Sequence, residues 1–323
     1  MTLESSDIAR RLSTRLKMRH LVLLLQIQQH GSLTRVAQHM ASSQPAVTNA
    51  LAELESMFGT ALFERSSRGM LPTALGEVVI ERARAMLHDL DHLARDMEAV
   101  AAGHGAHLHI GVIPFISGQI LSAALRRQQA SMERRLTVTI HEGTSDQLLH
   151  QLQDHTVDIV IGRASSVAER PQISFEVLYR QQPRLIASRR LAAQLGRVKL
   201  DWSKLAALDW ILGVQHSPMR EQVSDLFLAA GTTPPVPMVE TYSSKLIGEM
   251  IASSDTAVSI VPADIAEELV RFAGVSIVPY SFEWTLPPIA LFIRADVPLP
   301  PANRLFVESL RQVYEEAYGV IKQ

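Results

Sequence analysis

Polar side chains with the geometry to read base pairs gather within one short run of the chain. Gln44, Thr48 and Asn49 lie in the run SSQPAVTNALAELESMF. Ser43 can cap a helix there, and Pro45 fits the first turn of that helix. Gln and Asn can make paired hydrogen bonds to adenine, and Thr can meet a base edge or a thymine methyl group. We therefore interpret these residues as the leading end of a helix that enters the major groove of DNA.

The elements around this run fit a helix-turn-helix. Residues 18–30 carry a helical stripe of apolar side chains that ends at Gly31, and Ser32 then fits as the N-cap of a second helix over 33–41. The third helix, 44–58, follows after a very short turn. That arrangement is the one in which the later helix enters the major groove with its N-terminus first.

Basic side chains are concentrated in the same part of the chain. Residues 62–73 resemble a two-stranded wing, on which Arg65 and Arg68 would reach phosphates or the minor groove. Residues 10–72 contain eight Lys and Arg but only three Glu, whereas the whole chain of 323 residues has a formal net charge of −2. This local excess of positive charge predicts nucleic-acid binding by the N-terminal unit alone.

The ordered motifs of residues 16–80 resemble those of LysR-type transcriptional regulators. The SQPAVT run, the Leu54-Glu55 pair, the LFER run and the P-T-x-x-G end at Pro72–Gly76 follow one another in the order of that family. The resemblance implies a winged helix-turn-helix. With the residue types above, it gives the predicted DNA-binding set Ser32, Arg35, Ser43, Gln44, Pro45, Thr48, Asn49, Arg65 and Arg68.

The third helix also departs from the family pattern. Asn49, Ala52 and Glu53 occupy positions where family members often carry basic side chains. We therefore expect fewer phosphate contacts from this helix and an altered base preference.

A heptad pattern runs through a predicted helix over 74–102, for which Thr73 is the expected N-cap. Its apolar residues are spaced alternately by four and three positions, and charged side chains fill the remaining faces. The seam consists of Val79, Ala83, Met86, Leu90, Leu93, Met97 and Val100. Such a seam needs a partner, either its own domain or, as the resemblance implies, the same helix of a second subunit. A homodimer would bind an inverted-repeat operator, and a homotetramer is a further expectation from the family.

After residues 103–105, strands and helices alternate, which predicts an α/β fold with parallel sheets and helices on both faces. Two successive sets of alternating strands and helices predict two lobes with a cleft between them. This architecture is similar to the effector-binding domain of LysR-type regulators, which resembles periplasmic solute-binding proteins. The resemblance implies that the chain crosses between lobes near Arg163–Ser166 and returns near Ala266–Val275.

The predicted organisation is thus an N-terminal winged helix-turn-helix, a long linker helix and a two-lobed effector domain. Their expected ranges are 16–73 for the DNA-binding domain, 74–102 for the dimerising linker and 103–323 for the effector-binding domain, with lobe 1 at about 105–165 and 270–323 and lobe 2 at about 166–269.

Ligands on such sheets bind beyond the carboxyl ends of strands, where helix N-termini direct N–H groups inward. The candidate effector-binding residues at those places are Pro114, Phe115, Ser117, Thr144, Arg163, Gln215, His216, Ser217, Thr241 and Pro262. Hydroxyl caps and an arginine favour a small anionic or polar metabolite, such as an organic carboxylate. The alternative is ordinary helix capping by each hydroxyl and a surface ion pair for the arginine.

Several chemistries are excluded or disfavoured by the residue types. The chain has no cysteine, so disulfides, thiolate metal sites and cysteine nucleophiles are excluded. His88 and His92 are spaced for a metal, but we interpret these and the later histidines as structural. No phosphate loop or nucleophile elbow is present, and the His141-Glu142 pair is interpreted as structural.

The location and function follow from these readings. The start of the chain lacks the apolar core of a signal peptide, and residues 21–27 are too short to span a bilayer. We expect a cytoplasmic transcriptional regulator that binds double-stranded DNA and a small-molecule effector, has no other cofactor, contacts no membrane and is not an enzyme. The alternative is a solute-binding module or a ligand-processing enzyme without regulatory DNA binding, which would leave residues 16–73 unexplained.

Overall fold

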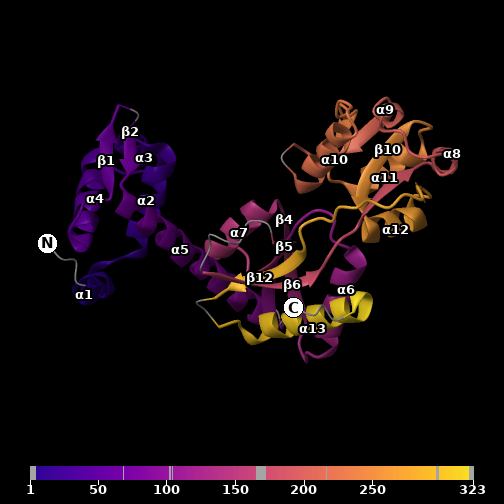
Figure 1. Cartoon of the computed structure of the whole chain (residues 1–323). Helices are drawn as coiled ribbons and strands as arrows, with labels where there is room; N and C mark the ends of the chain where they lie inside the picture. The colour runs from indigo at the N-terminus through magenta and orange to yellow at the C-terminus, as the bar shows by residue number, and fades with distance from the viewer. Residues whose placement is uncertain are drawn as a thin grey trace. The chain divides into compact units, whose positions relative to one another are not determined.

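The structure of the chain is a computed structural model that describes residues 5–67, 69–101, 103, 105–164, 172–215, 217–295 and 298–319. The predicted site residues Arg68 and His216 lie outside these ranges. The chain divides into two compact units (Figure 1). They are Met1–Ala102 with Gln153–Thr156, and Gly103–Leu152 with Val157–Gln323.

The first unit is a helix-turn-helix followed by a hairpin and a long helix. Its elements are α1 (Ser5–Arg15), α2 (Met18–His30), α3 (Leu33–His39), α4 (Gln44–Phe58), β1 (Phe63–Ser66), β2 (Gly69–Pro72) and α5 (Ala74–Ala101). The helices predicted over 18–30 and 44–58 and the two-stranded wing are confirmed. Gly31 and Gly59 end α2 and α4 because both adopt left-handed backbone angles, which glycine tolerates best.

The core of this unit forms where the apolar stripes of α2, α3 and α4 meet. Leu24, Ile27, Val36 and Leu54 are fully buried there. The first turns of α5 close the same core. The unit therefore has its own hydrophobic core, which fixes the orientation of α4.

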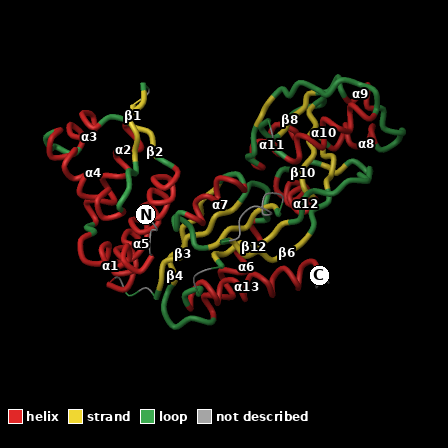
Figure 2. The backbone as a smooth tube through the Cα atoms, turned by 60° about the vertical axis from the view of Figure 1, so that its left-hand side comes forward, coloured by secondary structure: helices red, strands yellow, loops and turns green. Residues whose placement is uncertain are grey.

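The second unit contains two five-stranded sheets with helices. Its first sheet is formed by β3 (Ala106–Val112), β4 (Leu136–Glu142), β5 (Ile159–Arg163), β6 (Ile173–Tyr179) and β12 (Ile289–Arg294), and its helices are α6 (Gly118–Ala130), α7 (Ser145–Gln153) and α13 (Pro301–Tyr318). α6 and α13 lie side by side on one face of this sheet, and α7 lies on the other (Figure 2).

The second sheet and its helices follow β6 in the chain. The strands are β7 (Pro183–Ala187), β8 (Asp209–Leu212), β9 (Val239–Glu240), β10 (Ala257–Pro262) and β11 (Ser276–Ile277), and the helices are α8 (Arg189–Leu195), α9 (Trp202–Leu205), α10 (Pro218–Ala229), α11 (Ser244–Ala252) and α12 (Ala263–Phe272). The helices α8, α9 and α12 and the strand β6 were not predicted from the sequence.

The prediction of parallel sheets is wrong for one strand in each sheet. In the order β4-β3-β5-β12-β6, β12 runs antiparallel to both of its neighbours. In the order β11-β7-β10-β8-β9, β7 runs antiparallel to both neighbours. In each case the antiparallel strand is the first one after the chain has crossed from the other lobe. The preceding strand lies in the other sheet, so no crossover helix within the sheet sets the direction of β7 or β12.

The predicted crossing points between the lobes are also wrong. β6 still belongs to the first sheet, so the chain leaves this lobe at 180–182 and not near 163–166. It returns between β11 and β12, at 278–288, and not near 266–275. The wrong prediction followed from taking β5 as the last strand before the crossing.

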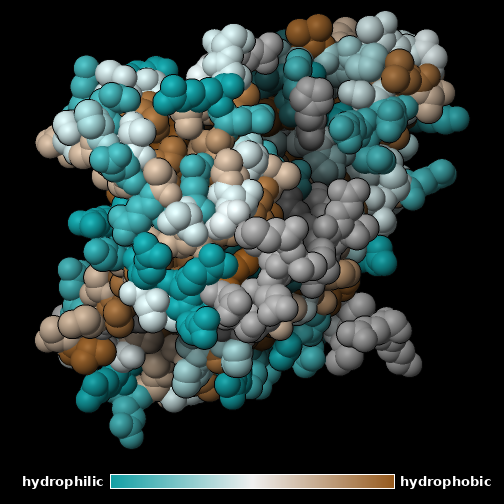
Figure 3. Space-filling model, turned by 90° about the vertical axis from the view of Figure 1, so that its left-hand side faces the viewer, coloured by the Kyte–Doolittle hydropathy of each residue, from teal (hydrophilic) through white to brown (hydrophobic). Residues whose placement is uncertain are grey.

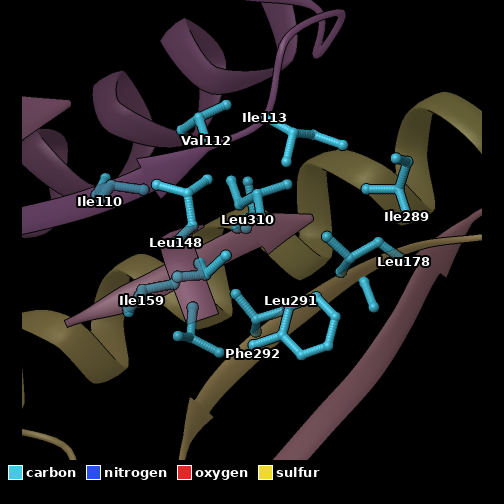
Figure 4. Close-up of a cluster of buried hydrophobic side chains, with 14 of the residues drawn as sticks. Ile110, Val112, Ile113, Leu148, Ile159, Leu178, Ile289, Leu291, Phe292 and Leu310 are labelled. Atoms are coloured by element: carbon cyan, nitrogen blue, oxygen red, sulfur yellow. The ribbon is translucent and has the colours of Figure 1, made fainter. Parts of the chain in front are cut away.

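The core of the first lobe surrounds the middle of its sheet. Figure 4 shows Ile110 and Ile159 with Leu291 and Phe292, which come from three neighbouring strands. Leu148 and Leu310 reach the same cluster from helices on opposite faces. The burial of both faces explains why β5 and β12 are apolar up to the arginine with which each strand ends.

Phe292→Ala should destabilise the second unit by about 3–5 kcal/mol, because Phe292 is fully buried and its removal leaves a cavity. Denaturant unfolding of the purified chain measures the change. The control is Phe272→Ala, since Phe272 is 78% exposed and its loss should change stability by less than about 0.5 kcal/mol. Equal effects of the two changes would contradict the core assignment.

Candidate DNA-binding surface and effector site

The leading end of α4 presents its polar side chains to solvent. Gln44, Pro45 and Asn49 are exposed, and Ser43 accepts a hydrogen bond from Ala46 N–H as the predicted N-cap. Thr48 is half-buried, and its hydroxyl donates to Gln44 O at 2.9 Å and accepts from Gln44 Nε2 at 3.2 Å. Because its proton is already used, Thr48 offers a DNA base a methyl group and an acceptor rather than a donor.

The supporting helix α3 agrees with the sequence prediction only in part. Arg35 is exposed on α3, where a phosphate could be reached. Ser32 stands at the N-cap position of α3, but its side chain makes no capping hydrogen bond. The prediction of a hydroxyl cap by Ser32 is therefore wrong.

The hairpin is attached to α4 by one carboxylate. Glu55 Oε1 accepts hydrogen bonds from Leu62 N–H at 2.8 Å and from Phe63 N–H at 3.2 Å. Since carboxylate acceptors make stronger hydrogen bonds than neutral groups, this contact fixes where β1 begins relative to α4. Arg65 then lies exposed on β1, opposite Met70 in the antiparallel register.

Two glycines allow the hairpin to approach the helices closely. Gly69 has φ +113°, and a Cβ at this position would overlap the carbonyl oxygen of Gly31. The neighbouring Met70 N–H donates to that same carbonyl at 2.8 Å. The hydrogen bond between the wing and the end of α2 therefore requires glycine at position 31, where the backbone is left-handed, and at position 69, where a Cβ would not fit.

Close backbone packing and helix capping also explain the P-T-x-x-G motif at Pro72–Gly76. The Thr73 hydroxyl caps α5 by accepting from Gly76 N–H at 3.0 Å, which confirms Thr73 as the predicted N-cap, and it donates to Ala61 O at 3.1 Å. Gly76 packs against the carbonyl of Leu62, where a Cβ would overlap. The motif joins the end of the wing to the start of α5.

The predicted seam on α5 divides between two environments. Ala83 is buried in the core of the first unit, and Val79 packs against that core, so these two residues are not available to a partner. The rest of the seam is exposed and consists of Met86, Leu90, Leu93, Met97 and Val100. On the face drawn in Figure 3, apolar side chains reach the surface in patches between polar ones.

In the second unit, Arg163 belongs to a buried network. It is 7% exposed and donates to Pro287 O at 3.0 Å and to Gln181 Oε1 at 2.6 Å. Burial lowers the pKa of Arg163 to about 10, so the guanidinium stays charged at neutral pH. A surface ion pair, the simpler alternative for Arg163, is therefore excluded.

The network continues from the first lobe to α12 of the second lobe. Gln181 Nε2 donates to Phe115 O at 2.9 Å, and the Tyr179 hydroxyl donates to Asp264 Oδ2 at 2.7 Å. Burial raises the pKa of Asp264 above its ordinary value, although hydrogen bonds from Tyr179 and Gln181 oppose that shift. Asp264 is thus a half-buried acceptor that joins the lobes.

A second carboxylate of α12 meets the N-terminus of α6. The Ser117 hydroxyl is buried and donates to Glu268 Oε1 at 2.5 Å. Ser117 does not cap its own helix. The predicted effector residue therefore already binds a carboxylate, which is supplied by the chain itself.

Other predicted hydroxyls are used for capping or turns. Thr144 accepts from Gln147 N–H, and Ser217 accepts from Arg220 N–H. The Thr241 hydroxyl accepts from Ser243 N–H within its own turn. The ordinary capping alternative thus accounts for these three residues.

The remaining predicted effector residues lie at different sites. Pro114 and Phe115 follow β3, and Phe115 is strained, because its φ of 66° is left-handed without glycine. Its ring packs edge-to-face on Tyr242 and against the core of the second lobe. Gln215 is exposed at the rim of a pocket of about 450 Å³, and Pro262 is buried at the N-cap of α12.

The histidine-rich strands form a cluster of rings. His109 Nδ1 lies 3.1 Å from His141 Nε2, and His107 Nε2 lies 2.8 Å from Thr139 Oγ1. Among the residues the structure describes, no group of His, Asp and Glu is arranged to hold a metal ion. The contact of His141 with His109 supports the structural interpretation of the His141-Glu142 pair.

Four residues that make the contacts between the lobes were not predicted from the sequence. Gln181 and Tyr179 lie around the true crossing between lobes, which was placed elsewhere. Asp264 and Glu268 lie on the unpredicted helix α12, directly after β10. The rule that ligands gather at the carboxyl ends of strands would have identified Asp264 as a candidate.

Two protein-family models match the chain. The model described as "Bacterial regulatory helix-turn-helix protein, lysR family" matches residues 18–77, and "LysR substrate binding domain" matches residues 101–315. The chain belongs to the LysR family. This LysR protein is therefore a DNA-binding transcriptional regulator with a domain for small molecules, the class that the sequence predicted.

Similar LysR regulators match over most of their length. GbpR of Azospirillum brasilense is 28% identical over 301 residues, which cover 93% of this chain and 87% of GbpR. PcaQ of Agrobacterium fabrum is 28% identical over 314 residues, which cover 94% of this chain and 97% of PcaQ. Both are named HTH-type transcriptional regulators.

Solved structures share the fold of this LysR protein. CbnR, a LysR family transcriptional regulator, matches with a TM-score of 0.57 at 22% identity and covers 93% of this chain and 99% of CbnR. CbnR complexed with its target DNA matches with a TM-score of 0.59 at 23% identity, covering 92% and 100%. Within the described ranges, no helix has the length and apolarity needed to cross a membrane.

Asp264→Asn should change the pH dependence of stability. A carboxyl with a raised pKa binds its proton more tightly in the folded state, so its stabilising contribution is full at low pH and is lost as pH rises above the ordinary value of 3.8. The free energy of unfolding of the original chain, minus that of the variant, should therefore fall as the pH rises through and above about 4. Urea unfolding over this range measures it, with the exposed Asp225→Asn as control. A difference that is independent of pH would contradict the burial of a raised-pKa carboxyl.

Proposed function

We propose that α4 of this LysR regulator reads base pairs in the major groove while the β1–β2 hairpin contacts the flanking backbone. The observation that carries the proposal is the exposed polar end of α4, held to the hairpin by Glu55. Gln44 and Asn49 supply amide groups for base contacts, and Arg65 supplies a phosphate contact. The full proposed set is Ser32, Arg35, Ser43, Gln44, Pro45, Thr48, Asn49, Arg65 and Arg68.

We propose that α5 pairs with α5 of a second copy of the chain. The five exposed apolar residues from Met86 to Val100 keep the heptad spacing after Val79 and Ala83 are assigned to the core. A narrow apolar seam of this kind is stabilised when two helices bury it together. The resulting dimer would place two α4 helices on the half-sites of an inverted repeat in cytoplasmic DNA.

The proposed effector is a small molecule with a carboxylate that binds at the N-terminus of α6. Support comes from the hydrogen bond between Ser117 and Glu268, since a carboxylate already occupies this hydroxyl. The free N–H groups in the first turn of a helix also favour an anion. The buried Arg163 nearby in the network supplies fixed positive charge. An anionic effector would replace Glu268 at Ser117 and so remove one of the contacts between α12 and the first lobe, while the contact of Asp264 with Tyr179 remains.

Gln44→Ala should weaken binding to the operator by about 1–3 kcal/mol and reduce base selectivity, because it removes a base contact. Arg65→Gln should weaken binding to all sequences alike and lower the slope of log K against log salt by about 0.9, because it removes one phosphate contact. Fluorescence anisotropy with DNA from upstream of the regulator's own gene, and with shuffled DNA, measures both.

The control for these DNA measurements is Lys199→Gln, an exposed charge change in the second unit. This variant should bind both DNAs as the original chain does. Absence of any salt-sensitive, sequence-selective binding by the original chain would refute the proposed role of α4.

Small organic carboxylates should raise the melting temperature of the protein more than their amides do. A ligand at about 100 times its Kd stabilises the folded state by about 2.7 kcal/mol. Glu268→Gln should increase the shift, because the competing carboxylate is removed. A thermal-shift panel of paired acids and amides measures this, and larger shifts from the amides would overturn the anionic assignment.

A further inference from the structure

A basic helix precedes the part of the chain that matches the family. The helix-turn-helix model begins at residue 18, whereas α1 spans Ser5–Arg15. Residues 8–19 contain five basic side chains and no acidic one. These basic residues are Arg10, Arg11, Arg15, Lys17 and Arg19.

The helix α1 is fixed to the first unit by packing. It lies against α4. Ile8 and Leu12 are half-buried, and Leu16 packs against the core of the unit. Leu16 N–H also donates to Leu12 O at 2.9 Å, which continues the last turn of α1. The basic side chains are therefore carried by an ordered element rather than by a free tail.

The position of α1 complements that of the hairpin. Both views of the backbone show α4 between α1 at one end of the unit and the β1–β2 hairpin at the other (Figures 1 and 2). At the side of α4, Arg19 lines the same groove of about 500 Å³ as Asn49 and Glu53. Arg10, Arg15, Lys17 and Arg19 are exposed to solvent.

The composition of α4 leaves the neutralisation of DNA phosphates to other elements of the unit. The helix Gln44–Phe58 contains no Lys or Arg, and it contains Glu53 and Glu55. A helix in the major groove lies between two phosphate backbones, and most DNA affinity comes from neutralising such phosphates. Arg65 on the hairpin can contact only the DNA phosphate backbone that lies on the hairpin side of α4.

We propose that α1 and the residues up to Arg19 form a second backbone-binding element, which contacts DNA phosphates on the side of α4 opposite the hairpin. The proposal rests on the proposed role of α4 in reading the major groove. The partner is the sugar–phosphate backbone, so α1 raises affinity for all duplex sequences without changing base preference.

The test uses the full chain with the double substitution Arg10→Gln and Arg15→Gln. Binding to operator and shuffled duplexes is measured by anisotropy over a series of salt concentrations. The expected result is a decrease of about 0.9–1.8 in the slope of log K against log salt, since each lost phosphate contact removes about 0.9. The ratio of the two affinities should stay within about twofold, because phosphate contacts carry no sequence information.

Two matched variants separate local contact from other effects. Arg10→Lys with Arg15→Lys keeps the charges and should retain the original salt slope. Arg189→Gln with Arg197→Gln removes two exposed charges from the second unit and should also leave the slope unchanged. Circular dichroism of each variant checks that helix content is kept.

The outcomes distinguish this proposal from the proposed function. A salt slope that the α1 glutamine variant leaves unchanged, while the original chain still binds DNA selectively, would refute the role of α1 alone. An equal decrease in the control from the second unit would also refute it, since the effect would then reflect net charge. No selective binding by the original chain would refute the reading role of α4 itself.

Discussion

The contact between Glu55 and the backbone at the start of the wing determines the shape of the DNA-binding unit. One carboxylate oxygen accepts from two consecutive N–H groups, those of Leu62 and Phe63. These donors would otherwise face a helix surface without a partner, and an unpaired buried N–H costs about 1–3 kcal/mol. The interaction therefore helps to set the distance between α4 and Arg65 on the hairpin. The glycine contacts at residues 31, 69 and 76 can form only when this spacing is kept.

Local sequence signals were sufficient to predict α2, α4 and the wing of the first unit, but not α1. Caps, glycine stops and a 3.6-residue apolar period act within a few residues, so they identified α2 and α4 with their ends. The division of the α5 seam was not predictable in the same way. Val79 and Ala83 continue the heptad spacing, but their use in the core depends on where α2 packs. Periodicity shows that a face is apolar without showing what covers it.

The second unit was predicted less well because its functional contacts join distant parts of the chain. The alternation of strands and helices predicted the α/β class and its two lobes. The network of Arg163, Gln181 and Asp264 depends on where the chain crosses between lobes, and local patterns do not show this. Several predicted hydroxyls proved to be ordinary caps, since every helix start has free N–H groups to satisfy.

Phe115 has a mechanical consequence for the two lobes. Its backbone belongs to the first lobe and is held in a left-handed conformation, which costs about 1–3 kcal/mol for a residue other than glycine. Its ring is anchored among apolar side chains of the second lobe, beside Tyr242. Separation of the lobes at this point therefore requires the ring to leave these apolar side chains. The free energy of that apolar contact offsets the cost of the left-handed backbone at the same residue.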